Sequence, residues 1–176
     1  DPAPAWLTEE TLAAHRASYG THSAREPRDI PPSPTKFPRD VEEIATLADF
    51  RHMIDGYDVG IRYADEHVGR ILNALADEGV LDDTIIMMSS DHGENQGELN
   101  VYGDHQTADH ITSRVPLIVR WPGLPGARAD RAFHYQMDMA ATMLDLLGIQ
   151  VPKLWDGRSF APALRAGEEA GRECLV

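Results

Sequence analysis

An aspartate and a histidine, Asp91 and His92, stand directly behind the apolar run 84–90 and ahead of Gly93. Open α/β sheets hold metal ions and reacting groups at the ends of such strands. A divalent ion could bind an oxygen of Asp91 and an imidazole nitrogen of His92 while other positions stay open for a substrate, and it would then act as a Lewis acid. We therefore take the pair as a candidate metal site. The plainer alternative for such a pair is a turn beside a surface histidine.

The elements that must position this pair are a long helix and two strands. From Leu47 to Leu75 the apolar residues follow steps of three and four, which places them on one stripe of an amphipathic helix. We expect Gly79 to end this helix. Strands are expected at 84–89 and 115–120, with a short helix between them at about 108–113. This order of elements predicts an α/β fold.

Shorter elements are expected on either side. A helix is predicted from Thr8 to Tyr19, with Thr8 as its N-cap, and the prolines of residues 20–39 predict an irregular surface segment. After the second strand, a helix should run from about 137 to 147 and end at Gly148. The turn 156–159 should open a last helix that reaches about Leu164, and 173–176 is a candidate strand.

The composition excludes several classes of function. The 176 residues have 42% hydrophobic and 26% charged side chains, as is ordinary for a globular domain, and a formal net charge of −13. That charge repels nucleic-acid phosphates, so we expect no nucleic-acid partner. No apolar stretch approaches the roughly 20 residues of a membrane span, and no signal peptide is evident. The single cysteine, Cys174, excludes an internal disulfide, and the compartment cannot be assigned.

Flanking segments extend the pattern around Asp91 and His92. Residues 81–84 read Leu-Asp-Asp-Thr, and residues 114–123 read Arg-Val-Pro-Leu-Ile-Val-Arg-Trp-Pro-Gly. Together with the helix at 138–145 and the Asp-Gly-Arg-Ser turn at 156–159, they resemble the sulfatase family of the alkaline phosphatase superfamily over about residues 40–165. One departure is Ala141, where the family commonly has proline.

The resemblance implies a partial alkaline-phosphatase-like sheet flanked by helices, among them the long amphipathic helix. Residues 1–39 would form an irregular N-terminal segment with one short helix. Residues 40–176 would form part of a sulfatase-type α/β catalytic domain whose upstream half is absent from this sequence.

For the site, the resemblance implies that Asp91 and His92 are metal ligands. The ion would be calcium, with manganese and zinc as alternatives that the imidazole nitrogen mildly favours. The family's other two ligands, an early Asp-Asp pair, are missing, since Asp82-Asp83 precedes a strand and is expected to be a surface turn. The formylglycine nucleophile of the family arises from a Cys-x-Pro-x-Arg or Ser-x-Pro-x-Arg motif, which these residues lack, and Cys174 does not fit it.

A second histidine, His105, occupies a position where many sulfatases have a lysine that contacts the sulfate, nine residues before Arg114. The resemblance makes His105 a candidate substrate-binding and catalytic residue, which could donate a hydrogen bond or protonate the leaving oxygen. A solvent-exposed loop histidine is the plain alternative. His110, where the family often has glutamate, receives no catalytic role, and Arg114 is expected to form a structural ion pair.

Two other metal-binding motifs do not fit this region, and several apolar and aromatic residues are expected to be structural. A calcium-binding EF-hand needs an oxygen ligand at its third position, which is Gly93 here, and no His-Glu-x-x-His zinc motif occurs. The pair Met87-Met88 and the aromatic residues Trp155 and Phe160 are expected to pack in the core.

The leading function is hydrolysis of a sulfate ester by the parent enzyme, with a sulfated small molecule or glycan as substrate. The 176 residues alone should be inactive without the nucleophile, and they should self-associate through apolar surface left uncovered. Two alternatives stay open. One is a phosphatase or phosphonate monoester hydrolase of the same superfamily, and the other is a non-catalytic module that keeps the fold.

Overall fold

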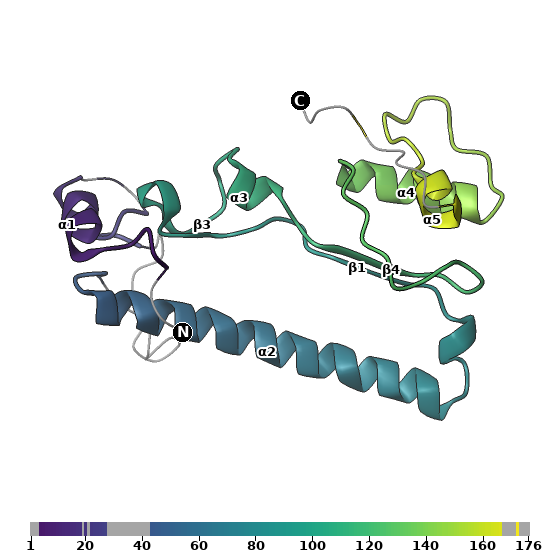
Figure 1. Ribbon diagram of the computed structural model, residues 1–176, viewed down its shortest axis with the longest axis horizontal. Coiled ribbons are helices and arrows are strands. Elements are labelled where there is room, and N and C mark those ends of the chain that lie inside the picture. The colour runs from purple at the N-terminus through teal and green to yellow at the C-terminus, as the bar shows by residue number, and fades with distance from the viewer. Residues whose placement is uncertain (1–3, 19, 21, 28–42, 167–171, 173–176) are drawn as a thin grey trace. The chain divides into compact units, whose positions relative to one another are not determined.

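The computed structural model describes residues 4–18, 20, 22–27, 43–166 and 172 (Figure 1). The chain forms two compact units, residues 1–119 and 120–176, and each is described by itself. The predicted strand at 173–176, Cys174 and most of the proline-rich segment 20–39 lie outside the described residues. Among the described helices, none is long and apolar enough to cross a bilayer.

The first unit begins with helix α1, Glu9–Ala17. Its N-cap is Thr8, whose hydroxyl accepts a hydrogen bond from the Thr11 amide at 3.1 Å, as predicted. A small core packs beside this helix and takes residues from distant parts of the chain; its members are Leu7, Leu12, Ala24, Ile44, Phe50 and Tyr102. The Tyr102 hydroxyl lies 2.8 Å from Nδ1 of His15, so even the polar end of this buried ring is satisfied.

Helix α2, Leu47–Asp77, is the long amphipathic helix that the apolar spacing predicted, and Figure 1 shows it as one unbroken helix. Its start is fixed by a capping box, in which Thr46 and Asp49 bond each other's backbone amides. Gly79 follows its end with a φ of +69°, a backbone conformation that suits glycine. Only Phe50 on this helix is buried, and several apolar residues farther along it are exposed: Tyr57, Val59, Ile61, Tyr63 and Ile71.

Two small sheets follow. Strand β1, Ile86–Ser89, pairs with β4, Leu117–Arg120, while β2, Asn95–Gln96, pairs antiparallel with β3, Tyr102–Asp104. The predicted strands are present, but β1 is half-buried, and so are Met87 and Met88. The 3-10 helices Leu81–Asp83 (η1) and Glu98–Asn100 (η2) and the short helix α3, His110–Ser113, complete the unit. Asp82-Asp83 is therefore a structural turn, as predicted.

The second unit contains α4, Gln136–Leu146, and α5, Ala161–Ala166. Gly157 of the Asp-Gly-Arg-Ser turn packs directly on α4, because a Cβ atom there would lie 2.3 Å from the Met137 carbonyl oxygen. The turn also donates the Arg158 amide to the buried carboxylate of Asp138 at 2.7 Å. Phe160 is buried as predicted, whereas Trp155 is 46% exposed, so its prediction as a core residue is wrong.

Candidate metal centre

A hairpin between β2 and β3 brings two distant residues of the site together. Asn95 pairs with Asp104 in this hairpin. The residue before Asn95 is Glu94 and the residue after Asp104 is His105, so antiparallel pairing places these two side chains opposite each other. The carboxylate of Glu94 lies 3.1 Å from Nδ1 of His105.

Gly93 fixes the backbone on the other side of Glu94. Its amide donates a hydrogen bond to the Thr112 carbonyl at 2.8 Å, and a Cβ atom at this position would lie only 2.1 Å from the Ile111 carbonyl oxygen. No other residue has room here, because the clash would be with backbone rather than with a movable side chain. The short helix α3 thus holds the segment 91–94 in place.

A hydrogen-bonded network below the hairpin anchors the loop that carries His105. The side-chain amide of Asn95, which is fully buried, donates to Thr107 at 2.9 Å and to Asp109 at 3.2 Å. Asp109 also caps α3 by accepting from the amides of Ile111 and Thr112. The hydrogen bond from the Thr107 hydroxyl, assisted by the others, lowers the pKa of Asp109 to about 2.

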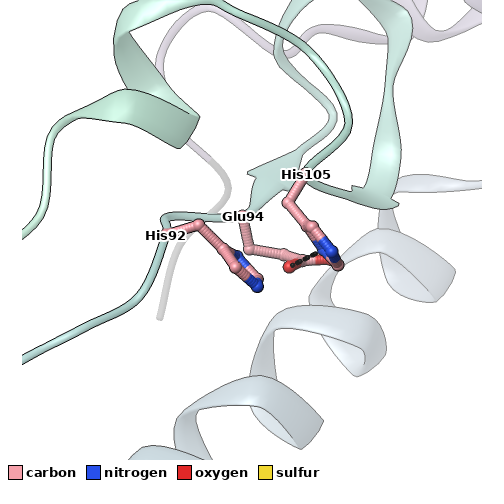
Figure 2. Close-up of side chains that lie close together, drawn as sticks. All are labelled: His92, Glu94 and His105. Atoms are coloured by element: carbon pink, nitrogen blue, oxygen red, sulfur yellow. Dashed lines mark hydrogen bonds and ion pairs between the residues drawn. The ribbon is translucent and has the colours of Figure 1, made fainter.

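The imidazoles of His92 and His105 stack on each other. Their ring centroids lie 3.7 Å apart, with 17° between the ring planes. Figure 2 shows both rings reaching out on the same side of the backbone, with the carboxylate of Glu94 beside them. One possible ligand atom from each of His92, Glu94 and His105 lies within 4.8 Å of the other two. Among the described residues, these three side chains form the group that could hold a metal ion.

Asp91 lies beside this group but is not one of its three members. Its Oδ2 atom is 3.7 Å from Nε2 of His92, so the two side chains lie on the same side of the chain, as a shared ion requires. The carboxylate accepts the His92 amide at 3.0 Å, which is the main reason that the pKa of Asp91 is lowered. Its side chain is 86% exposed and therefore accessible to an ion or a substrate.

The sequence analysis proposed Asp91 and His92 as a metal-binding pair, which stays a prediction, and it did not propose Glu94. One signal was present, since Glu94 follows His92 by two residues, the spacing that puts side chains on one side of an extended segment. The partnership with His105 could not be predicted, because it depends on the hairpin register. The predicted contact between His105 and the substrate stays a prediction.

The donor types determine which ions fit. Two imidazole nitrogens with one or two carboxylates are ligands of manganese, zinc and other first-row ions. Calcium prefers six to eight oxygen atoms, of which these residues supply only the carboxylates of Asp91 and Glu94. The residues of this chain therefore fit a first-row transition ion better than the expected calcium.

The chain matches a known protein family. The sulfatase family profile matches residues 11–149. An N-acetylglucosamine-6-O-sulfatase of Bacteroides thetaiotaomicron is 38% identical over 101 residues, which are 57% of this chain and 18% of the relative. The first curated relatives are much longer, since the matched regions cover between 10% and 25% of their lengths.

Solved structures agree on the fold. A protein solved in complex with its substrate D-glucosamine-2-N,6-O-disulfate has a TM-score of 0.56 and 32% identity, with 67% of this chain and 24% of that chain covered. A phosphonate monoester hydrolase from Silicibacter pomeroyi has a TM-score of 0.67 and 26% identity, with 96% and 32% covered. The predicted α/β class is confirmed. The chain belongs to the sulfatase family.

Proposed function

We propose that the protein to which these residues belong hydrolyses sulfate esters, and that Asp91 and His92 hold the cation of its active site. The observation that carries the proposal is the 3.7 Å approach of Asp91 Oδ2 to His92 Nε2 at the end of β1. The match of the sulfatase family to 11–149 supports the reaction class. The similar N-acetylglucosamine-6-O-sulfatase suggests a sulfated amino sugar as substrate.

A bound cation would supply Lewis-acid stabilisation of the negative charge that develops on the sulfuryl oxygens. The chain's own residues prepare for it. Nδ1 of His92 donates to the Gly93 carbonyl at 2.8 Å, which fixes the ring and leaves Nε2 on the open side. Because these 176 residues carry a net charge of −13, their attraction for an anionic ester must come from this local site rather than from their overall charge.

The nucleophile of this proposal is a formylglycine outside these 176 residues. Within them no Cys-x-Pro-x-Arg or Ser-x-Pro-x-Arg sequence occurs. The 176-residue chain should therefore show no multiple-turnover hydrolysis of an aryl sulfate, since loss of a covalent nucleophile costs orders of magnitude in rate.

A second candidate is hydrolysis of phosphonate monoesters. It is favoured by the similarity to the phosphonate monoester hydrolase, which extends over 96% of this chain with a TM-score of 0.67. The same cation and histidines suit a phosphonate, because it too develops negative charge on oxygens around the reacting atom.

The test measures the complete gene product with glucosamine 6-sulfate, an aryl sulfate and an aryl phosphonate monoester. We expect kcat/KM to be highest for a sulfate ester. Asp91→Asn and His92→Ala should each lower it by at least about a hundred-fold, because they remove a ligand of the cation. Asp82→Asn, in the structural turn η1, is the control and should have little effect. Preference for the phosphonate would support the second candidate, and full activity of both site variants would refute the proposed site.

A further inference from the structure

We infer that His105 is a ligand of the same cation as His92, and that Glu94 holds His105 in the orientation this requires. The ion would be a first-row transition metal such as zinc, manganese or cobalt. The inference rests on the cation site of the proposed function, but it assigns His105 to the metal rather than to direct contact with the sulfate.

Hydrogen bonds fix which nitrogen of each ring carries the proton. Nδ1 of His92 faces the Gly93 carbonyl oxygen at 2.8 Å, and a carbonyl can only accept, so this nitrogen carries hydrogen. Nδ1 of His105 faces the Glu94 carboxylate at 3.1 Å and likewise donates. In a neutral imidazole the other nitrogen then has a free lone pair. Both rings therefore offer Nε2 as a ligand atom.

This arrangement is the usual one for histidines that bind metals. Such a ring donates its second N–H to a backbone carbonyl or a carboxylate, which fixes its orientation and raises the basicity of the ligating nitrogen. His92 has the carbonyl and His105 has the carboxylate. Glu94 is therefore a positioning residue in this assignment, and it need not touch the ion.

The two imidazole rings also lie near each other. The rings stack with centroids 3.7 Å apart, and Figure 2 shows them extending in the same direction. Two nitrogens that are each about 2.1 Å from one ion lie roughly 3.0–3.4 Å from each other. Because an imidazole binds an ion in the plane of its ring, the two rings must turn out of their nearly parallel stack for both to bind. The carboxylate of Asp91, 3.7 Å from Nε2 of His92, is in place as a third ligand.

Contacts within the chain hold the segments that carry these two rings. The β2–β3 pairing sets Glu94 opposite His105, Gly93 packs on the backbone of α3, and the buried Asn95 ties the two loop segments together. The two imidazoles are therefore ordered by contacts within this chain, which makes binding measurable on the chain itself.

The experiment titrates the 176-residue chain with Co²⁺ and Zn²⁺, by absorption in the visible d–d bands and by calorimetry. We expect one site that excess Ca²⁺ does not displace. His105→Gln should weaken binding at least about a hundred-fold, and Glu94→Gln about 10–100-fold. His67→Gln is the matched control, because His67 also places Nδ1 2.8 Å from a backbone carbonyl, that of Tyr63, but on the exposed surface of α2. It should leave the affinity unchanged.

Unchanged affinity of a folded His105→Gln variant would overturn the assignment, as would displacement of Co²⁺ by Ca²⁺ or the absence of Co²⁺ binding at 1 mM, about the weakest affinity a specific site would show. If this variant does not fold, long-range ¹⁵N NMR of the unsubstituted chain decides. Zn²⁺ should shift the Nε2 resonances of both His92 and His105 while both Nδ1 stay protonated, and a shift of His92 alone would refute the inference. Because none of these readouts needs turnover, His105 can fail as a ligand while sulfate hydrolysis stands.

Discussion

Helix α2 was predicted from the sequence, whereas the β2–β3 hairpin of the segment 91–113 was not, and the two regions are stabilised in different ways. Beyond its first turns α2 presents apolar side chains to solvent, with Ile61 55% and Ile71 62% exposed. The segment 91–113 instead satisfies its own polar groups through a hairpin, a buried asparagine and the cap of α3. The local contacts of this chain thus account for the candidate metal centre but not for the apolar stripe of α2.

The largest expected difference in the free energy of unfolding is between substitutions at two residues of α2. Phe50→Ala should destabilise the chain by about 3–5 kcal/mol, because Phe50 is 1% exposed and packs edge-on against Tyr102 in the first unit's core. Ile61→Ala, on the same stripe but exposed, should change the free energy of unfolding by less than about 0.5 kcal/mol. Urea denaturation of both variants measures this. Equal costs would mean that the distal stripe is covered in solution.

A pair of glycine substitutions sharpens the contrast. Gly93→Ala should cost about 1–3 kcal/mol and disturb the His92–His105 stack, because the new methyl group would meet the Ile111 backbone. Gly60→Ala in α2 should stabilise by about 0.5–1 kcal/mol, since nothing lies within 4 Å of its Cβ position and alanine is the better helix former. Thermal unfolding of the two variants shows whether each is destabilised or stabilised. A stabilising Gly93→Ala would contradict the packing of the segment 91–94 on α3.

Acid should weaken the segment 91–113 through Asp109. Its pKa is about 2 in the folded chain and near 3.9 in an unfolded one, so the folded state gains stability above pH 4 and loses it as the pH falls from about 4 to 2. Asp109→Asn should flatten the pH dependence of unfolding in this window. The pH dependence of Tm is compared between the Asp109→Asn variant and the unsubstituted chain, because the other acidic groups titrate equally in both. Identical pH profiles would show that Asp109 is not held by Thr107 and Asn95.

The smallest expected effect is on association. We predict that the exposed stripe of α2 lets the 176-residue chain self-associate at high concentration. A variant with Ile61→Lys and Ile71→Lys should shift the average mass in light scattering toward the monomer while its helical circular dichroism is retained. A chain that is monomeric at all concentrations without these substitutions would contradict the prediction.

The parts of the structure that sequence could predict are those set by local rules. Periodicity located α2, Thr8 capped α1 as expected, and the apolar runs located β1 and β4. Asp91 and His92 were placed together because they are neighbours in sequence. Glu94 was missed and Trp155 was wrongly assigned to the core, because both outcomes depend on packing between residues that are distant in the chain.

We infer above all that His92 and His105 bind one cation. X-ray absorption fine structure at the cobalt edge of the Co²⁺-loaded 176-residue chain tests it directly, because multiple scattering from imidazole rings counts the histidines bound to the metal. We predict two imidazole nitrogens at about 2.1 Å, together with oxygen ligands, and one imidazole in His105→Gln. A first shell with a single imidazole in the unsubstituted chain would contradict the account.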